Sequence, residues 1–462
     1  MDLLEAAAAT GGTALHGNPS FTGVSTDSRS VGTGDLFVAL TGENFDGHDY
    51  VAAAFERGAA AAVVRRGWAG VSQRALLEVD APLAALGALA ANWRARFDLP
   101  LIGVTGSNGK TTVKEMCAAI LRARMAEQGL DPLIAVLATQ GNLNNDIGLP
   151  LMLLRMRPNH CSAVIEMGMN HPGEIAYLTG LARPTVAVVT NAQRAHLEGM
   201  GGLAAVAEEK GAIYGGLGES GIAVVNADDP FADYWRGING DRCCISFGLG
   251  HPADVAGSCT PHGLQSLLRL RSWAGDAEIR LQVPGLHNAR NAVAAAAATL
   301  AAGASLDAVC AGLEAYRGVK GRLHVRAAQS GATLIDDSYN ANPDSVRAAI
   351  DVLAATPGKT ILVFGDMGEI GERAGQLHDE IGGYAKSAGI DRLYAIGDHA
   401  ALAASNFGVG GHHFQKVDSL VAALVRELTK DTVVLVKGSR FMRMERVADA
   451  LAAPDDKDNH AA

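Results

Sequence analysis

Apolar runs of strand length alternate with long, alanine-rich stretches along this chain of 462 residues. Strands of a parallel sheet that helices cover on both faces read as continuous apolar runs, whereas half-exposed strands alternate apolar and polar residues. The pattern therefore predicts an α/β fold in which helices separate parallel strands. The eight clearest runs cover residues 99–105, 162–168, 185–191, 221–227, 332–338, 360–366, 392–398 and 432–438.

Most of these runs end in a polar residue. In open α/β sheets, ligands bind beyond the carboxyl ends of the strands, so polar side chains at those ends predict binding sites along one edge of each sheet. The residues concerned are Thr105, Glu166, Asn191, Asp337, Asp366, Asp398 and Lys437.

The strand and helix signals divide the chain into three blocks, which we expect to be three domains. Residues 1–98 mix short strand signals with alanine-rich helices. Residues 99–316 begin with a glycine-rich turn and contain most of the charged motifs. Residues 317–462 hold a second set of strand–helix units, which starts in the segment YRGVKGR.

Composition narrows the class of protein. Hydrophobic residues make up 48% of the chain, which supports substantial cores and argues against disorder. With 39 basic and 49 acidic residues the net charge is −10, which disfavours a general nucleic-acid binder. The most apolar stretch, residues 292–304, is shorter than the roughly 20 residues that a membrane span needs. The six cysteines show no metal-binding spacing. We therefore expect a cytoplasmic protein with reduced thiols and no membrane span.

The segment LIGVTGSNGKTT reads as a strand, a glycine-rich turn and a helix start. Glycines let the backbone turn tightly and point N–H groups at phosphate oxygens, a lysine adds positive charge, and a hydroxyl can reach Mg²⁺. Val104 stands where the usual phosphate-loop motif has its first glycine. The alternative is a glycine-rich turn before an ordinary helix, which the joint occurrence of all these features disfavours. The predicted nucleotide contacts are Gly106, Ser107, Asn108, Gly109, Lys110, Thr111 and Thr112.

Three further side chains are candidates for the metal and for catalysis. Glu166 ends an apolar strand, where a carboxylate is costly unless it is paired or metal-bound. His196 follows another strand, and Mg²⁺ could be held by Thr111, Glu166 and His196. A structural histidine remains the alternative for His196. Lys210 lies in a predicted helix, and by itself it reads as a surface lysine.

Asparagine-rich motifs offer amide groups for recognition without charge. GNLNNDIGLP holds Asn142, Asn144 and Asn145, and a self-bonded loop is the alternative. Asn288 and Asn291 share a helix face, where one could cap the helix and one could read a base. In DDSYNANPDS the candidates are Asp337, Asn340 and Asn342, with an ordinary capped turn as the alternative.

Together these motifs resemble the signatures of the Mur ligases. The resemblance rests on TGSNGKTT, GNLNNDIGLP, EMGMNHPGEI, AHLEG, GLHNARN and DDSYNANPDS, and on similar segments near both ends, STDSRSVGTGDLFVALTGENFDGHDY and VKGSRFMRMERV. It covers residues 24–447. One departure is the segment NAQR before AHLEG.

The resemblance implies the fold and the roles of the three blocks. The first block, 1–98, would bind the UDP end of a substrate through Ser25, Asp27, Ser28 and Arg29. The second, 99–316, would be a central parallel-sheet phosphate-loop ATPase domain, and the third, 317–462, a Rossmann-like domain. In the second block, Lys110 and Thr111 would hold ATP and Mg²⁺, Glu166 and His196 would be metal ligands, and Lys210 would carry a carbamate. Asn288 and Asn291 would lie at adenine. From the third block, Arg322 and Asp337 would contact the nucleotide, and Asn340 and Asn342 would contact the acceptor.

The implied activity is ATP-dependent addition of D-alanyl-D-alanine to UDP-N-acetylmuramoyl-tripeptide in peptidoglycan precursor synthesis, by a monomer. The absence of a DNPR motif, which grips diaminopimelate in a related ligase, agrees with that acceptor. Two alternatives remain: an amide ligase like folylpolyglutamate synthetase, and a non-catalytic nucleotide-binding scaffold. The catalytic candidates are Lys110, His196 and Lys210, and whether His196 serves as base or as metal ligand stays open.

Overall fold

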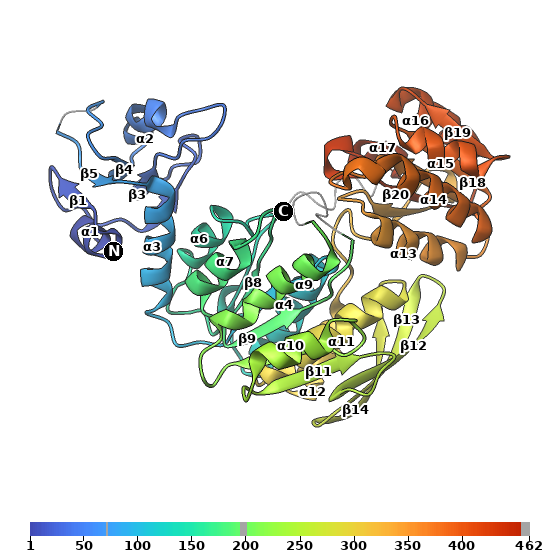
Figure 1. Cartoon of the computed structure of the whole chain (residues 1–462), viewed down its shortest axis with the longest axis horizontal. Helices are drawn as coiled ribbons and strands as arrows, with labels where there is room; N and C mark the ends of the chain where they lie inside the picture. The colour runs from blue at the N-terminus through green and yellow to red at the C-terminus, as the bar shows by residue number, and fades with distance from the viewer. Residues whose placement is uncertain (71–72, 195–200, 454–462) are drawn as a thin grey trace.

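The computed structural model describes residues 1–70, 73–194 and 201–453. Three β-sheets follow one another along the chain and lie in an arc, with the first sheet at one end, the largest in the middle and the third at the other end (Figure 1). All eight predicted strands are present, and they belong to the second and third sheets. No helix in the described ranges is long and apolar enough to cross a membrane.

The first sheet has the strand order β1-β5-β4-β3-β2, with β1 antiparallel to β5 and the other neighbours parallel. Its elements are α1 (Leu3–Thr10), β1 (Thr13–Leu15), β2 (Gly23–Ser25), β3 (Asp35–Val38), the 3-10 helix η1 (Gly47–Tyr50), α2 (Val51–Glu56), β4 (Ala61–Arg65) and β5 (Leu76–Val79).

Helix α3 (Pro82–Arg94) joins this sheet to the next part of the chain. It begins at a proline, whose fixed φ suits the first helical turn. Its buried residues Leu86 and Leu89 belong to one core that also contains Leu3 from α1 and Met152 from the second part. The helix therefore packs against both neighbours, and burial of its apolar face ties the first sheet to the second.

The second sheet has the order β14-β13-β12-β11-β10-β9-β6-β8-β7. Its strands are β6 (Leu101–Thr105), β7 (Val136–Ala138), β8 (Ser162–Glu166), β9 (Val186–Val189), β10 (Ile222–Asn226), β11 (Cys244–Gly248), β12 (Val255–His262), β13 (Gln265–Ser272) and β14 (Gly275–Leu281). Its helices are α4 (Lys110–Glu127), α5 (Pro132–Ala135), α6 (Gly148–Leu153), α7 (Glu174–Ala182), α9 (Leu203–Gly211), η2 (Ala212–Gly216), α10 (Ala232–Asn239), α11 (Leu286–Ala301) and α12 (Leu306–Ala315).

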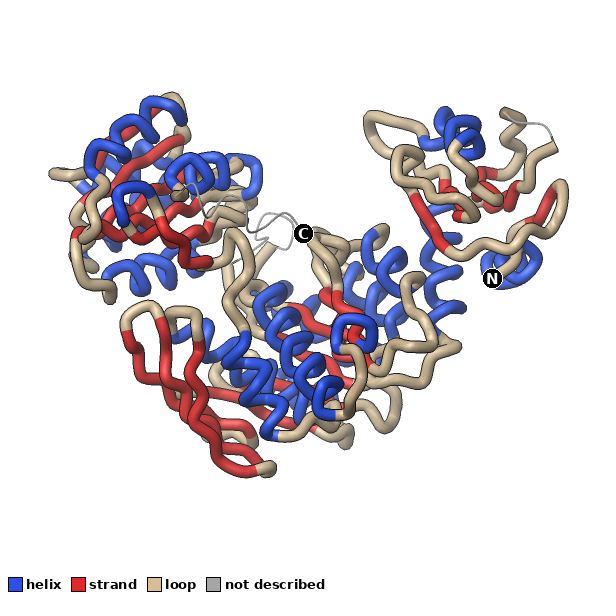
Figure 2. Tube along the Cα trace, turned by 180° about the vertical axis from the view of Figure 1, so that it is seen from behind, coloured by secondary structure: helices blue, strands red, loops and turns tan. Residues whose placement is uncertain are grey.

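Only part of this sheet follows the parallel pattern. The strands from β7 to β12 are parallel, whereas β12, β13 and β14 form an antiparallel ribbon at one edge. The ribbon is visible in Figure 2 as the long red strands at the lower left. In β13 the burial alternates along QSLLRLRS because one face is partly exposed, so this strand shows no continuous apolar run.

The third sheet has the order β15-β16-β20-β17-β18-β19, and only β15 is antiparallel to its neighbour. Side chains of alternating strand residues enter two separate cores, one under α13 and α14 and the other under α16 and α17, so helices cover both faces. Its elements are β15 (His324–Ala327), η3 (Gln329–Gly331), β16 (Thr333–Asp337), α13 (Pro343–Ala354), β17 (Lys359–Gly365), η4 (Gly371–Arg373), α14 (Ala374–Ser387), β18 (Arg392–Ile396), α15 (Ala400–Phe407), β19 (Gly411–Phe414), α16 (Val417–Glu427), β20 (Thr432–Lys437), η5 (Arg440–Met442) and α17 (Glu445–Leu451).

The strand register brings the predicted polar ends to one edge of the second sheet. Strand β6 lies between β8 and β9, and Val104 pairs with Glu166 while Thr105 pairs with Val189. The glycine-rich turn after β6 is therefore flanked by Glu166 on one side and by Asn191 on the other, as parallel strands require.

Candidate active site

A cleft of about 360 Å³ lies between the second and third sheets. From the second sheet it is lined by the glycine-rich turn and by the segments that follow β8 and β9. From the third sheet it is lined by the ends of β16 and β20 and by the loop after β17. Most of the sequence-predicted nucleotide contacts line it, namely Ser107, Asn108, Gly109, Lys110, Thr112, Asn288, Asn291, Arg322 and Asp337.

Two glycines of the turn have backbone conformations that a side chain would disturb. Gly106 has φ +144°, and a Cβ there would lie 1.9 Å from Thr190 Oγ1. Gly109 has φ +82°, and a Cβ there would lie 2.4 Å from Asn291 Oδ1. Both positions need glycine, and at Gly109 the turn is in direct contact with helix α11.

Lys110 is the first residue of α4 and folds back over the turn. Its Nζ donates to the carbonyl oxygens of Gly106, at 2.7 Å, and Ser107, at 3.2 Å. Burial lowers the pKa of Lys110 to about 8, although the Glu166 carboxylate opposes this shift. A phosphate would favour the charged form again, so the ammonium is well placed to respond to an anion in the cleft.

Glu166 is 2% exposed at the end of β8. Its Oε1 accepts a hydrogen bond of 2.8 Å from Asn144 Nδ2, while its buried Oε2 has no hydrogen-bond partner among the described residues. An unpaired carboxylate oxygen in a buried position is costly, and a cation or its bound water would satisfy it. These residues therefore fit Mg²⁺, although Thr111, at 8% exposure, does not line the cleft.

Lys210 is fully buried on α9, so its interpretation as a surface lysine is wrong. Its Nζ has no hydrogen-bond partner in the described part of the chain. Burial, followed by the charge of Lys110, lowers the pKa of Lys210 well below its ordinary value. The neighbouring Glu209 is not its hydrogen-bond partner, because both carboxylate oxygens accept N–H groups at the start of α7.

The predicted metal and catalytic residue His196 lies outside the described residues. Within the described ranges, no group of three or more His, Cys, Asp or Glu side chains is arranged to hold a metal ion. Any metal bound here therefore takes few protein ligands among the described residues, as is usual for Mg²⁺ on a nucleotide.

The asparagines of the predicted motifs differ in whether they line the cleft and in what they contact. Asn144 orients Glu166, and Asn145 lines the cleft while its Oδ1 accepts the Gly148 N–H at 2.9 Å. Asn142 is exposed and does not line the cleft. On α11, Asn288 Nδ2 donates to Pro284 O at 2.8 Å, and Asn291 Nδ2 lies 3.4 Å from Asn288 Oδ1.

On the third sheet's side, Asp337 forms an ion pair with the buried Lys437, with Nζ and Oδ2 2.6 Å apart. Burial raises the pKa of Asp337, and the charge of Lys437 opposes this shift. The Arg322 guanidinium lies 4.3 Å from the centre of the Tyr339 ring. Asn340 contributes its backbone carbonyl to Lys437 Nζ, at 2.9 Å.

The predicted UDP-side residues lie on the first sheet and do not line the cleft. Ser25 ends β2, and its Oγ donates to Asp27 O at 3.0 Å. The exposed Arg29 guanidinium holds Asp27 in an ion pair of 2.7 Å, which lowers the pKa of Asp27 to about 2. Ser28 lies in the same turn and is half-buried.

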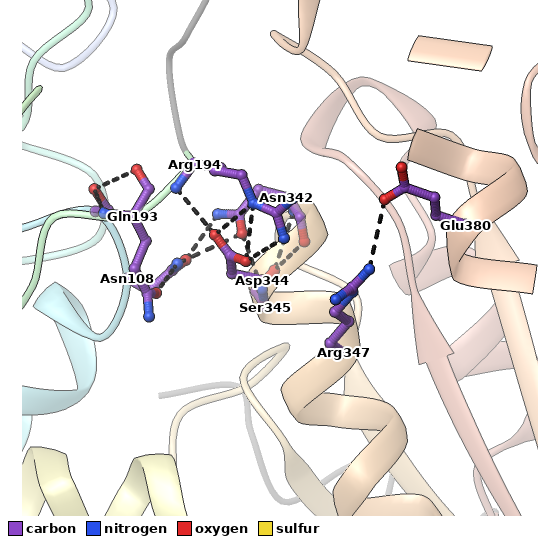
Figure 3. A network of polar contacts seen from close by, with 9 residues as sticks. Asn108, Gln193, Arg194, Asn342, Asp344, Ser345, Arg347 and Glu380 are labelled. Atoms are coloured by element: carbon purple, nitrogen blue, oxygen red, sulfur yellow. Dashed lines mark hydrogen bonds and ion pairs between the residues drawn. The ribbon is translucent and has the colours of Figure 1, made fainter. Parts of the chain in front are cut away.

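Two polar contacts cross the cleft, one between residues that the sequence analysis selected and one between Arg194 and Asp344, which it did not select. Asn342 Nδ2 donates to Asn108 Oδ1 at 2.8 Å, and Arg194 pairs with Asp344 (Figure 3). Asn342 also caps α13 by accepting the Ser345 N–H at 2.9 Å. In the sequence, Arg194 lies in the segment NAQR, where this chain departs from the family motif. Only the structure shows that its partner, Asp344, lies in the motif DDSYNANPDS.

Comparisons with known proteins agree along the whole chain. Residues 20–94 match the model "Mur ligase family, catalytic domain", 104–299 match "Mur ligase middle domain" and 321–440 match "Mur ligase, glutamate ligase domain". The UDP-N-acetylmuramoyl-tripeptide–D-alanyl-D-alanine ligase of Escherichia coli K12 is 43% identical over 93% of both chains.

Solved structures show the same arrangement of α/β domains. A crystal structure of MurF from Acinetobacter baumannii superposes with a TM-score of 0.88 at 34% identity, covering 96% of this chain and 97% of that one. MurF from Thermotoga maritima in complex with ADP gives a TM-score of 0.80 at 29% identity, covering 93% and 96%. With this identity, coverage and fold, the chain belongs to the Mur ligase family.

Proposed function

We propose that this chain is an ATP-dependent ligase that adds D-alanyl-D-alanine to UDP-N-acetylmuramoyl-tripeptide through an acyl phosphate, in peptidoglycan precursor synthesis. The observation that carries the proposal is the 43% identity, over 93% of both chains, to the Escherichia coli ligase with that activity in its name. The cleft supports it because a glycine-rich turn with a half-buried lysine faces a wall that comes from a separate sheet.

The chemistry requires activation of a carboxylate, which is a poor electrophile. Transfer of the γ-phosphoryl group of ATP to the carboxylate gives an acyl phosphate, the amine attacks its carbonyl carbon, and phosphate leaves. Lys110 lies where its ammonium can neutralise charge on the phosphates during the first transfer. The turn residues Ser107 to Gly109 and Thr112 bind the phosphates beside it.

Mg²⁺ fits the polar groups beside this turn. Glu166 would hold it through its unpaired Oε2, with Thr111 and His196 as further candidate ligands. When bound, the ion supplies positive charge that offsets the phosphate oxygens.

Lys210 is proposed to carry a carbamate. Its buried, unpartnered amine and its lowered pKa support this, because only the neutral amine reacts with carbon dioxide. A carbamate would place two oxygens where the structure has a single unsatisfied nitrogen.

The remaining candidate site residues are assigned to different substrates. Asn288 and Asn291 lie beside the turn and are proposed to contact adenine, while Arg322 and Asp337 contact the nucleotide from the opposite wall. Asn340 and Asn342 are proposed for the acceptor dipeptide, Asn142, Asn144 and Asn145 for substrate binding, and Ser25, Asp27, Ser28 and Arg29 for UDP. These roles accompany the proposed domains 1–98, 99–316 and 317–462 of a monomer.

An acceptor screen tests the function. Phosphate release is measured with UDP-N-acetylmuramoyl-tripeptide, ATP and a single amine: D-alanyl-D-alanine, free diaminopimelate or glutamate. We expect D-alanyl-D-alanine to give the highest turnover. Equal turnover with glutamate on a folate substrate would favour a folylpolyglutamate-synthetase-like enzyme, and no acceptor-dependent release would favour a scaffold.

A further inference from the structure

A multiple hydrogen-bonded ion pair between the second and third sheets joins Arg194 to Asp344. Arg194 follows β9, and Asp344 is in the first turn of α13, 150 residues later in the chain. The backbone N–H of Arg194 donates to Asp344 Oδ2 at 3.0 Å, Nε lies 3.1 Å from Oδ1, and Nη2 lies 2.6 Å from Oδ1 (Figure 3). Both the backbone and the side chain of Arg194 therefore grip one carboxylate.

This pair is better placed than an ordinary surface salt bridge. The Arg194 and Asp344 side chains are only 34% and 23% exposed, so part of each is removed from water. Multiple N–H donors to one carboxylate add directional specificity, which a lysine could not reproduce. The carboxylate also lies in the first turn of α13, where the helix dipole favours negative charge.

A second contact beside the pair involves the glycine-rich turn itself. The side-chain amides of Asn108 and Asn342 face each other, with Asn342 Nδ2 2.8 Å from Asn108 Oδ1 and Asn108 Nδ2 3.5 Å from Asn342 Oδ1. Asn108 Nδ2 also donates to Gln193 Oε1 at 2.7 Å. Because Gln193 directly precedes Arg194, the turn, the segment after β9 and the start of α13 form one connected network.

The start of α13 is itself rigid. Asn342 and Ser345 form a capping box, in which each side chain bonds to the other residue's backbone. A shift of Asp344 would therefore move Asn342 with it, and also the cleft-lining residues that immediately precede the helix, Asn340 and Ala341.

We propose that Arg194 is a positioning residue, which clamps the start of α13 over the phosphate-binding turn and thereby aligns the acceptor side of the cleft with Lys110. This inference rests on the proposed function, which assigns phosphate binding to the glycine-rich turn and acceptor binding to Asn340 and Asn342. Arg194 acts through Asp344 and Asn342 and does not itself line the cleft. Most of the apolar core of each sheet lies in separate clusters, so we expect each domain to fold without the pair.

The test compares Arg194→Ala with Arg347→Ala. Arg347 is also on α13 and is also paired, with Nη2 3.5 Å from Glu380 Oε2, but both partners belong to the third sheet's domain (Figure 3). We expect Arg194→Ala to raise the KM for the acceptor or lower kcat by about tenfold, because the two walls move apart and the reacting groups lose their alignment. The melting temperature should stay close to wild type. Arg347→Ala should keep the KM, kcat and the ADP dissociation constant within about twofold of wild type and leave the melting temperature unchanged.

A double-mutant cycle completes the design. Asp344→Asn should lose activity like Arg194→Ala, and the double variant should lose no more than the worse single variant, because the two residues act as one unit. Wild-type kinetics in Arg194→Ala, multiplicative losses in the double variant, or a large fall in melting temperature would each overturn the clamp.

A structural readout separates this inference from the proposed function. Small-angle X-ray scattering should show a larger radius of gyration for Arg194→Ala than for wild type and for Arg347→Ala. An unchanged radius would overturn the clamp even if the ligase assay succeeds. Absence of ligase activity in the wild type would overturn the proposed function while leaving the scattering result to decide the clamp.

Discussion

Replacing Gly109 with alanine should lower activity with ATP through a steric clash that a matched glycine variant, Gly129→Ala, does not produce. Gly109 has φ +82°, and a left-handed conformation costs a residue with a Cβ about 1–2 kcal/mol. The new Cβ would also lie 2.4 Å from Asn291 Oδ1, whereas ordinary contacts begin at 3.4 Å. The turn or the Asn291 side chain must therefore shift by about 1 Å, the difference between these two distances.

The effect of the clash can be separated from the effect of backbone strain by comparison with Gly129. This glycine has φ +73° just after α4, and a Cβ there would meet nothing within 4 Å. Gly129→Ala therefore carries the backbone strain of Gly109→Ala without its clash. We expect Gly129→Ala to lose about 1–2 kcal/mol in the free energy of unfolding, measured in urea, and Gly109→Ala to lose at least as much, because the clash adds to the strain.

Only Gly109→Ala should lose activity. A misplacement of about 1 Å at a reacting group costs about 100-fold in rate, or about 2.7 kcal/mol of transition-state stabilisation. The assay is kcat/KM for ATP, measured through acceptor-dependent phosphate release. Activity within about twofold of wild type in Gly109→Ala, or an equal loss in Gly129→Ala, would refute the steric argument.

The remaining predictions concern Lys110 and Lys210. Lys110→Ala should abolish ligation and leave the fold intact, as circular dichroism would check; near-normal turnover would exclude the assigned role. Lys110 has a pKa of about 8 in the folded chain against 10.5 ordinarily, so above pH 8 the free protein must take up a proton to bind phosphate. The affinity for ADP should therefore fall by up to about tenfold per pH unit above pH 8. An ADP affinity that does not change with pH in calorimetry would contradict this. Between pH 8 and 10.5 the unfolded chain binds more protons at this group, so the group's own contribution makes the unfolding free energy rise with pH. Lys210→Ala should lose most activity and regain part of it with an added short carboxylic acid, whereas a fully active variant would exclude the carbamate.

Local patterns in the sequence are sufficient to predict the parallel strands and the glycine-rich turn. A buried parallel strand needs a continuous apolar run, and a tight phosphate-binding turn needs glycines before a lysine, so the eight runs and the turn at Gly106–Thr111 could be recognised without contacts. The shared edge of Thr105 and Glu166 followed from strand direction alone. The antiparallel strands β13 and β14 were missed because their half-exposed residues alternate.

The environment of each functional side chain depends on packing between distant segments. Lys210 reads as a surface lysine in its own helix, and only the folded chain buries its amine without a partner. Arg194 and Asp344 are 150 residues apart, and Asn108 and Asn342 are 234 apart, so no local pattern can pair them. The physical reason is that strand and helix formation depend on neighbours along the chain, whereas burial, pKa shifts and ion pairs across the cleft depend on how the finished sheets pack.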